Sequence, residues 1–305
     1  MKQAGPAASF TPLTTGELVK KARKVEIVAR RLVDEQLAGQ YHSVFKGRGL
    51  VFSDVRPYTA GDDVRAIDWN ITARMNAPHV KQFVEERDRT VNLVIDMSAS
   101  GFFGTRGASK RELAAELAAV VAFSAIKNND RVGLTIVTDK VERFVPAKKG
   151  RRHVMRVIRE ILAFRPASRG TNLAAGLDFL GKIARRRSVV FLVSDFLSEG
   201  WERAMQITRQ RHELVPIVVG DPLEHALPAV GLLVLEDLES GELVELDTSS
   251  AAAVDYARRA RAASAGRALA LRRLNLDCVE IHTDRPYVDA LIAFFRARAK
   301  RMAHG

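Results

Sequence analysis

The chain has 305 residues, of which 47% are apolar and 28% are charged. This composition is typical of soluble globular proteins and excludes wholesale disorder. The one cysteine, Cys278, excludes an internal disulfide framework and any zinc or iron–sulfur site built from several cysteines. The formal net charge of +12 favours an anionic partner, such as nucleic acid, a membrane surface or an acidic protein. Half of this excess lies in residues 251–305, which carry 11 basic and 5 acidic side chains.

No apolar run approaches the ~20 residues that a transmembrane helix needs. The best candidate, 117–126, is only 10 residues long and lies between Glu116 and Lys127. The N-terminus has no apolar segment of the kind found in secretory signals. We therefore expect a cytoplasmic protein without a membrane span.

The first 39 residues are expected to form a loose tail followed by a helix over 14–37. Thr14 or Thr15 can cap this helix, and apolar residues then recur on one face. Gly39 is expected to end it.

Residues 40–90 have a different character. Glycines and prolines punctuate short apolar stretches that carry many charged side chains. This pattern predicts a small β-rich subdomain that connects the helix to the rest of the chain.

From residue 91 the chain alternates between apolar strands and helices, and we expect one domain over 91–305. Continuous apolar runs such as Val91–Ile95 are typical of strands that are buried on both faces. The pattern predicts a doubly wound, mainly parallel sheet flanked by helices. Expected strands are 91–95, 132–137, 141–145, 189–193, 214–219, 232–235, 243–246 and 278–282. Expected helices are 109–127, 151–164, 172–184, 200–211, 251–273 and 286–301.

Oxygen-bearing side chains follow two of the predicted strands. Asp96 comes directly after 91–95, with Ser98 and Ser100 at the next alternate positions, and Asp195 ends the strand 189–193. Thr171 opens the helix 172–184. Because ligands bind beyond the carboxyl ends of parallel strands, these groups can converge on a hard cation such as Mg²⁺ or Mn²⁺. Asp195 is expected to act through water, since Mg²⁺ keeps several waters.

This set, in this order on an α/β pattern, resembles the von Willebrand factor A domain over about residues 91–285. In that family it forms the metal-ion-dependent adhesion site, or MIDAS. The resemblance implies a metal site made of Asp96, Ser98, Ser100, Thr171 and Asp195. One departure is Arg169, which stands where the family often has a glycine.

A longer string of residues precedes the predicted strand 91–95, which Asp96 follows. It begins with Gly47 and Gly49, continues through Phe52-Ser53-Asp54, and ends with Glu85-Glu86-Arg87 before Asp88-Arg89. Its middle part contains Arg56, Tyr58, Gly61, Asp62, Asp63, Arg65, Ile67, Asp68, Trp69, Ala73, Arg74, Val80 and Lys81. This signature resembles the bacterial family catalogued as domain of unknown function 58, in which it precedes a von Willebrand A-like domain.

The family resemblance implies a partner as well as a fold. Members resemble partners of MoxR-type AAA+ ATPases that act in the assembly, maturation or metal insertion of protein complexes. Many carry two transmembrane helices near the N-terminus, and this chain looks like the form without them.

The charged signature residues have two readings. They can form buried ion pairs that fix the β-rich subdomain to the A-type domain, because charged side chains are rarely buried unpaired. They can instead bind a partner. Trp69 is expected to be a core residue. The residues concerned are Arg56, Tyr58, Gly61, Asp62, Arg65, Asp68, Trp69 and Arg74.

Two functions other than metal-dependent protein binding are also open. Asp96 at a strand end suggests a magnesium-dependent phosphohydrolase with an aspartyl nucleophile, but Ser98 stands where such enzymes, by resemblance, need a second aspartate to handle the proton. The basic helix 251–273 suggests nucleic-acid binding, although only Tyr256 offers a nearby aromatic ring for stacking. The sequence has no phosphate-binding P-loop and no G-x-S-x-G nucleophile motif.

We therefore expect a non-enzymatic, metal-dependent protein-interaction module. The five side chains cannot fill a six-coordinate shell alone, so a carboxylate from a partner protein can complete it. A bound cation among partly neutral hydroxyl ligands keeps positive character and favours that anionic ligand.

Overall fold

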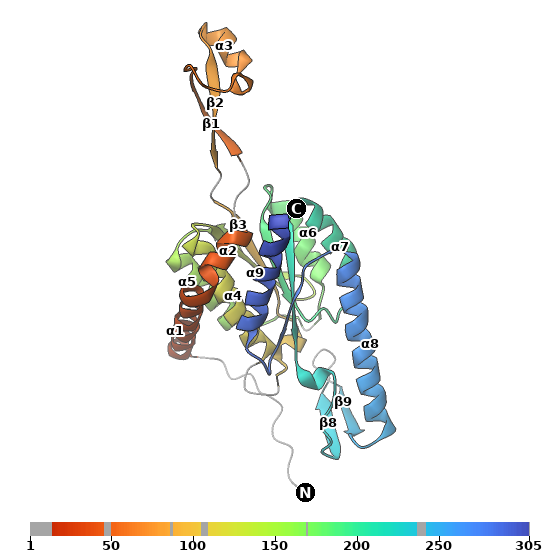
Figure 1. Ribbon diagram of the computed structural model, residues 1–305. Helices are drawn as coiled ribbons and strands as arrows, with labels where there is room; N and C mark the ends of the chain where they lie inside the picture. Colours follow the sequence, from red (N-terminus) through yellow and green to blue (C-terminus); the bar gives the residue numbers. More distant parts are fainter. Residues whose placement is uncertain are drawn as a thin grey trace.

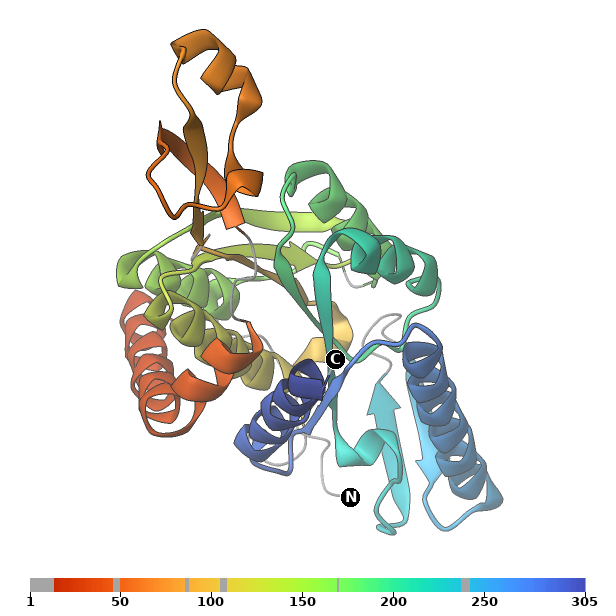
Figure 2. The ribbon, with the colours of Figure 1, turned by 45° about the horizontal axis from the view of Figure 1, so that its top comes forward.

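A mainly parallel six-stranded sheet forms the centre of the protein in the computed structural model (Figures 1 and 2). The structure describes residues 14–45, 50–85, 88–104, 109–168, 170–236 and 242–304. The strand order is β10-β7-β6-β3-β4-β5, and only the β4–β5 pair is antiparallel. The strands are β3 (Thr90–Asp96), β4 (Arg131–Val137), β5 (Val141–Lys148), β6 (Val189–Ser194), β7 (Glu213–Gly220) and β10 (Val279–His282). This confirms the expected α/β architecture with a mainly parallel sheet flanked by helices.

The inner strands are buried on both faces. All of β6 is buried, and so is β3 from Val91 to Ile95. Along β3 the side chains alternate: Leu93 and Ile95 belong to one hydrophobic cluster, whereas Val94 belongs to the other. Each face of the sheet therefore has its own core.

Helices cover both cores (Figure 2). The cluster that contains Leu93 is closed by α1 (Thr15–Leu32), α2 (Ala38–Val44), α4 (Lys110–Lys127), α5 (Arg151–Ala163) and α9 (Tyr287–His304). The cluster that contains Val94 is closed by α6 (Leu173–Ile183), α7 (Glu202–Arg211) and the end of α8 (Ala251–Arg273). No helix within the described ranges is both long enough and apolar enough to cross a membrane.

The N-terminal helix packs onto this domain. Thr14 caps α1 in a reciprocal capping box with Glu17, as the sequence indicates. The prediction that Gly39 ends the helix is wrong, because a π-helical segment (Val33–Leu37) leads directly into α2. Beyond Gly39, Tyr41 and Phe45 are buried in the core, and this burial outweighs the ~1 kcal/mol helix penalty of one glycine.

The connector forms an arm that projects from the domain (Figure 1). Strands β1 (Leu50–Pro57) and β2 (His79–Glu85) pair antiparallel, which agrees with the expected β-rich character. A short 3-10 helix (Val64–Ala66) and the unpredicted helix α3 (Trp69–Met75) lie between them. Asp68 caps α3 by accepting hydrogen bonds from the backbone N–H groups of Asn70 (3.0 Å) and Ile71 (3.2 Å).

The charged residues of the arm bond within the arm. The Arg56 guanidinium forms two hydrogen bonds to the Asp62 carboxylate, at 2.7 and 2.6 Å, and these bonds hold the pKa of Asp62 far below its usual value. Asp68 pairs with Lys81 at 3.7 Å. The interpretation that such pairs fix the subdomain to the domain is therefore wrong for Arg56, Asp62 and Asp68, because their partners belong to the arm itself.

The tip of the arm is open to solvent. Trp69 is 69% exposed, so the prediction that it is a core residue is wrong. Arg65 and Arg74 are exposed too and form no ion pair within the described residues. The residues Gly47, Gly49, Glu86, Arg87 and Arg169, which the sequence singles out, lie outside the described residues.

A second hairpin lies beside α8 at the opposite end of the molecule from the arm (Figure 1). It consists of β8 (Leu232–Glu236) and β9 (Leu243–Asp247), which pair antiparallel as expected. The remaining predicted helices and strands of 91–305 all form, with ends displaced by a few residues.

Helix α6 lies against the sheet at a glycine. A Cβ at Gly176 would lie 2.5 Å from Cγ2 of Val137, a stiff β-branched side chain of β4. On the same helix, a Cβ at Gly181 would have nothing within 4 Å.

We predict that Gly176→Ala lowers the free energy of unfolding by about 1–3 kcal/mol through overpacking. Gly181→Ala is the matched control and should raise stability by about 0.5–1 kcal/mol, because alanine is the better helix former. Urea unfolding followed by circular dichroism measures both. Equal effects of the two substitutions would contradict the close contact between α6 and β4.

Candidate functional site

The candidate site lies where the strand order changes direction. Strands β4 and β5 extend from one side of β3, whereas β6, β7 and β10 extend from the other. Ligands of open α/β sheets bind beyond the carboxyl ends of the strands at such a switch point. Since Ile95 pairs with Val193 in register, Asp96 and Asp195 leave neighbouring strands close to one another.

The loop after β3 places three oxygen-bearing side chains together. Oδ1 of Asp96 accepts the backbone N–H of Ser98 at 3.0 Å. The hydroxyl oxygens of Ser98 and Ser100 lie 3.2 Å apart, because a short 3-10 helix (Ala99–Phe102) begins just after Ser98 and turns the chain back. The structure thus brings Asp96, Ser98 and Ser100 to one point, as the sequence predicts.

Strand β6 contributes a hydroxyl that the sequence analysis missed. The Ser194 hydroxyl donates to Oδ2 of Asp96 at 2.6 Å and accepts the backbone N–H of Phe196 at 3.0 Å. Phe196 has a left-handed backbone (φ +54°), so the chain turns sharply just after the strand. Ser194 therefore connects the β3 carboxylate to the β6 turn.

Asp195 is engaged by a buried lysine. The Lys110 ammonium, on the first residue of α4, lies 3.0 Å from Oδ2 of Asp195 and also pairs with Glu224. Lys110 is only 3% exposed. Arg267 of α8 donates to the backbone carbonyl of Asp195 at 2.8 Å.

Thr171 lies at the same edge of the sheet. It directly precedes Asn172, whose backbone N–H donates to the carbonyl of Thr138 at the end of β4 (2.6 Å) and whose side chain caps α6. The structure thus gathers four of the five predicted residues around one small space and leaves Thr171 beside the β4–β5 turn.

That space is a cavity of about 20 Å³, room for about one water molecule or ion. Thr171 is not among the described residues that line it. Its polar lining consists of Asp96, Ser98, Ser100, Lys110, Arg111, Ser194 and Asp195.

The two aspartates differ in their electrostatics. Desolvation, together with repulsion from Asp195, raises the pKa of Asp96 to about 6, although hydrogen bonds from Ser194 and Ser98 partly oppose this. Burial alone would raise the pKa of Asp195, but the charge and hydrogen bond of Lys110 outweigh burial and lower it. Burial likewise fails to lower the pKa of Lys110, because Asp195 and Glu224 raise it. Lys110 is therefore a cation at neutral pH.

The donor set fits one hard divalent cation. The carboxylates of Asp96, Asp195 and Glu224 and the ammonium of Lys110 sum to a formal charge of −2. Arg111, which also lines the cavity, adds one positive charge. Of these three carboxylates, Asp96 is the one that Lys110 does not pair with, and the two serine hydroxyls beside it are ligands that Mg²⁺ and Mn²⁺ accept. Within the described residues no three His, Cys, Asp or Glu side chains gather to hold a metal, so this site depends on its hydroxyls.

Sequence reasoning missed Lys110, Ser194, Glu224 and Arg267. One signal was present for Lys110. The middle of its helix, Leu117–Phe123, is a continuous apolar run that indicates a buried helix, although this run alone does not show where the lysine of the first turn lies.

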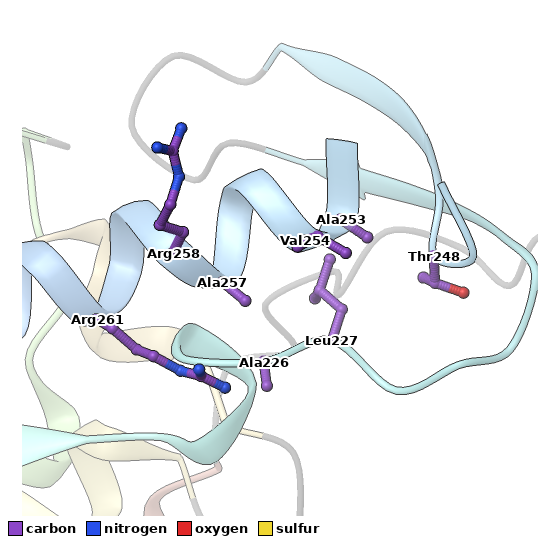
Figure 3. Close-up of a pocket in the computed structure, with 8 residues that line it drawn as sticks. All are labelled: Ala226, Leu227, Thr248, Ala253, Val254, Ala257, Arg258 and Arg261. Atoms are coloured by element: carbon purple, nitrogen blue, oxygen red, sulfur yellow. The ribbon is translucent and has the colours of Figure 1, made fainter. Parts of the chain in front are cut away.

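A larger pocket lies between α8 and the loop after β7 (Figure 3). Its volume is about 420 Å³, and its floor is apolar, with Leu227 and Val254 facing one another. Arg261 reaches toward Ala226, whereas Arg258 is paired with Asp255. No carboxylate lines it within the part of the chain that the structure describes, so it does not offer metal chemistry.

Several basic side chains of the C-terminal region form ion pairs within the chain. Arg258 and Arg259 both pair with Asp255. Arg298 pairs with Glu213, and Arg301 pairs with Asp277. Of these four arginines, Arg298 is mostly buried, whereas Arg258, Arg259 and Arg301 stay open to solvent.

Comparison with known proteins shows which family the chain resembles. The family model described as "Protein of unknown function DUF58" matches residues 54–266. The uncharacterized protein Rv1480 of Mycobacterium tuberculosis is 35% identical over 287 residues, which is 93% of this chain and 90% of that protein. The uncharacterized protein YeaD of Bacillus subtilis is 27% identical over 122 residues, which is 40% of this chain and 27% of that protein.

Solved structures show weaker similarity. BatB from Bacteroides thetaiotaomicron is 14% identical, with a TM-score of 0.45, and the match covers 70% of this chain and 99% of that one. An aerotolerance-related membrane protein from Bacteroides fragilis has a TM-score of 0.46 at the same identity and coverage. Both scores lie below 0.5.

We predict that the raised pKa of Asp96 makes the metal-free protein less stable as pH rises from about 4 to about 6. The folded state holds the proton up to about pH 6, whereas the unfolded chain releases it near 3.8, so the free energy of unfolding falls across this window by at most about 3 kcal/mol. Asp96→Asn removes this decline. Urea unfolding in chelator at pH 4.5 and 7 measures the difference.

The matched control is Asp178→Asn, which changes an exposed aspartate of α6 and should keep the wild-type pH profile. At pH 7, Mg²⁺ should stabilise the wild type and leave Asp96→Asn unchanged. An identical pH dependence in wild type and Asp96→Asn would show that Asp96 does not titrate in this window.

Proposed function

The chain belongs to the DUF58 family, and we propose that it is a non-enzymatic, metal-dependent protein-interaction module with a MIDAS-type site in a von Willebrand A-like domain. The single observation that supports this most is the meeting of Asp96, Ser98 and Ser100 beside a cavity large enough for one ion, at the switch point of the sheet. The site would take Mg²⁺ or Mn²⁺.

In this proposal each residue has a distinct role. Asp96, Ser98 and Ser100 hold the ion directly, and Asp195 completes its surroundings. Thr171 lies at the same edge of the sheet but does not line the cavity, so it has no direct contact with the ion in this proposal. Because Asp195 is already bound by Lys110, it acts through water. When bound, the ion supplies a positive charge that can accept a carboxylate from a partner protein.

Ser194 prepares Asp96 for this role. Its hydroxyl and the Ser98 backbone N–H each donate to one oxygen of the Asp96 carboxylate, so the carboxylate has a fixed orientation before any ion arrives. Preorganisation of this kind lowers the cost of binding.

The residues around Asp96 support a binding role better than hydrolysis. A phosphohydrolase would need a group that exchanges a proton with its substrate. Ser98 and Ser194 are hydroxyls, and Lys110 is held between Asp195 and Glu224. A magnesium-dependent phosphohydrolase that uses Asp96 is the alternative function, and it predicts turnover that the interaction module lacks.

The partner that we propose is an AAA+ ATPase of the MoxR type. This follows from the family resemblance of the signature residues and not from any contact in the structure. The module would then serve as an adaptor in the assembly, maturation or metal insertion of protein complexes.

We predict that purified MoxR-type ATPase from the same organism is captured by the wild-type protein in Mg²⁺ and at least tenfold less in chelator. Asp96→Asn should lose capture in both conditions, because the ion bridges the two proteins. Quantitative pull-down with purified proteins measures this, and Asp178→Asn is the matched control. Full capture by Asp96→Asn in chelator would rule out the metal bridge.

The alternative is tested on the same proteins. Hydrolysis of p-nitrophenyl phosphate by the wild type but not by Asp96→Asn would support the phosphohydrolase. The interaction module predicts no Asp96-dependent hydrolysis.

A further inference from the structure

We propose that Lys110 sets the ligand preference of the metal site: its ammonium weakens binding of the metal ion alone and keeps the loaded site receptive to a partner's carboxylate. This inference rests on the proposed function and assigns a role to a residue outside the predicted ligand set.

Lys110 occupies an unusual position for a lysine. Lysine is rarely fully buried, yet Lys110 is 3% exposed and lies on the wall of the cavity that Asp96, Ser98 and Ser100 line. Its ammonium touches Asp195 at 3.0 Å and Glu224, so one fixed cation already lies within the group of carboxylates that would attract a metal ion.

The surrounding chain holds Lys110 in place from three directions. Ser109 caps α4 directly before it, in a reciprocal capping box with Glu112. Arg267 fixes the backbone of Asp195 from α8. Glu224 ends a short 3-10 helix after β7 whose cap, Asp221, is fully buried. The ammonium therefore cannot move away from the cavity without breaking its ion pairs with Asp195 and Glu224.

The charge of the site follows from this geometry. With Lys110 present, the three carboxylates and the ammonium carry a formal charge of −2, and a divalent ion brings this set of groups to zero. Arg111 also lines the cavity and adds the same positive charge to every variant, so it leaves the differences between them unchanged. Without the lysine charge the same groups would carry −3 in the empty site and −1 in the loaded site. The more negative site binds a metal ion more tightly but repels an incoming carboxylate, because like charges in a poorly hydrated site interact strongly.

A purely structural role for Lys110 makes a different prediction. If the lysine only joined α4 to the strand ends, its loss would loosen the site and weaken metal and carboxylate binding together. If its charge sets the ligand preference, loss of that charge changes the two affinities in opposite directions.

The experiment compares the wild type with three variants, and the number after each protein is the formal charge of its loaded site relative to wild type. The proteins are wild type (0), Lys110→Met (−1), Glu224→Gln (+1) and the double variant Lys110→Met/Glu224→Gln (0). Lys127→Met is the matched control, because Lys127 lies on the same helix but pairs with Asp34 at the surface. The free Mn²⁺ signal in electron paramagnetic resonance measures metal affinity. Water-proton relaxation of bound Mn²⁺ during an acetate titration measures how readily a carboxylate replaces water.

We expect Lys110→Met to bind Mn²⁺ at least tenfold more tightly than wild type and to bind acetate at least threefold more weakly. Glu224→Gln, whose side chain is partly exposed and easier to replace, should show both changes with the opposite sign. The double variant and Lys127→Met should resemble wild type. The double variant keeps the test valid if Lys110→Met alone folds poorly.

Two results would overturn the inference in distinguishable ways. If the variants bind Mn²⁺ but both affinities fall together, Lys110 is structural and the proposed function stands. If no protein of the series binds Mn²⁺ at millimolar concentration, both the inference and the metal-dependent function fail.

Discussion

The hydrogen bond from Ser194 to Asp96 is the contact on which the site depends. It joins the last residue of β6 to the last residue of β3 at 2.6 Å, and it lies at the point where the sheet changes direction. Burial of the two strands, with helices on both faces, fixes the backbone from which both side chains extend. The sheet therefore places a partly desolvated carboxylate, with two serine hydroxyls beside it, at the wall of a cavity that has room for about one ion.

A buried carboxylate without a counter-ion costs free energy, and the protein offsets only part of that cost. Lys110 neutralises Asp195, while Asp96 receives hydrogen bonds but not the lysine charge, so the pKa of Asp96 rises to about 6. Functional sites commonly combine such perturbed groups with a cavity. In the proposed function a divalent ion supplies the missing charge, and the fixed ammonium limits how negative the site becomes.

Much of this could be predicted from the sequence, because strand ends and buried apolar runs are local patterns. The positions of four site residues follow from two apolar runs: Asp96 comes directly after the first, with Ser98 and Ser100 close behind, and Asp195 follows the second after one intervening residue. Lys110 could not be predicted in the same way, since its partner Asp195 lies 85 residues away and its burial depends on how α4 meets β6 and the loop after β7. Helical periodicity alone assigns a lysine at the start of a helix to solvent.

The errors in the connector and at Gly39 have related causes. The sequence pattern places Trp69 and the charged residues of the arm in an interior, but the described part of the arm buries only a few side chains, such as Ile67 and Val80. Gly39 was expected to end a helix, yet the burial of Tyr41 and Phe45 carries the helix through it. In both cases tertiary packing, which composition does not reveal, decides between two locally acceptable structures.

The most direct measurement is anomalous diffraction from a crystal of the protein grown with Mn²⁺. We predict one anomalous peak within coordination distance of the Asp96 carboxylate and the Ser98 and Ser100 hydroxyls, with the Lys110 ammonium still against Asp195. No peak at this site in Mn²⁺-saturated crystals, or a peak elsewhere with Asp96 left unbound, would contradict the proposed metal site.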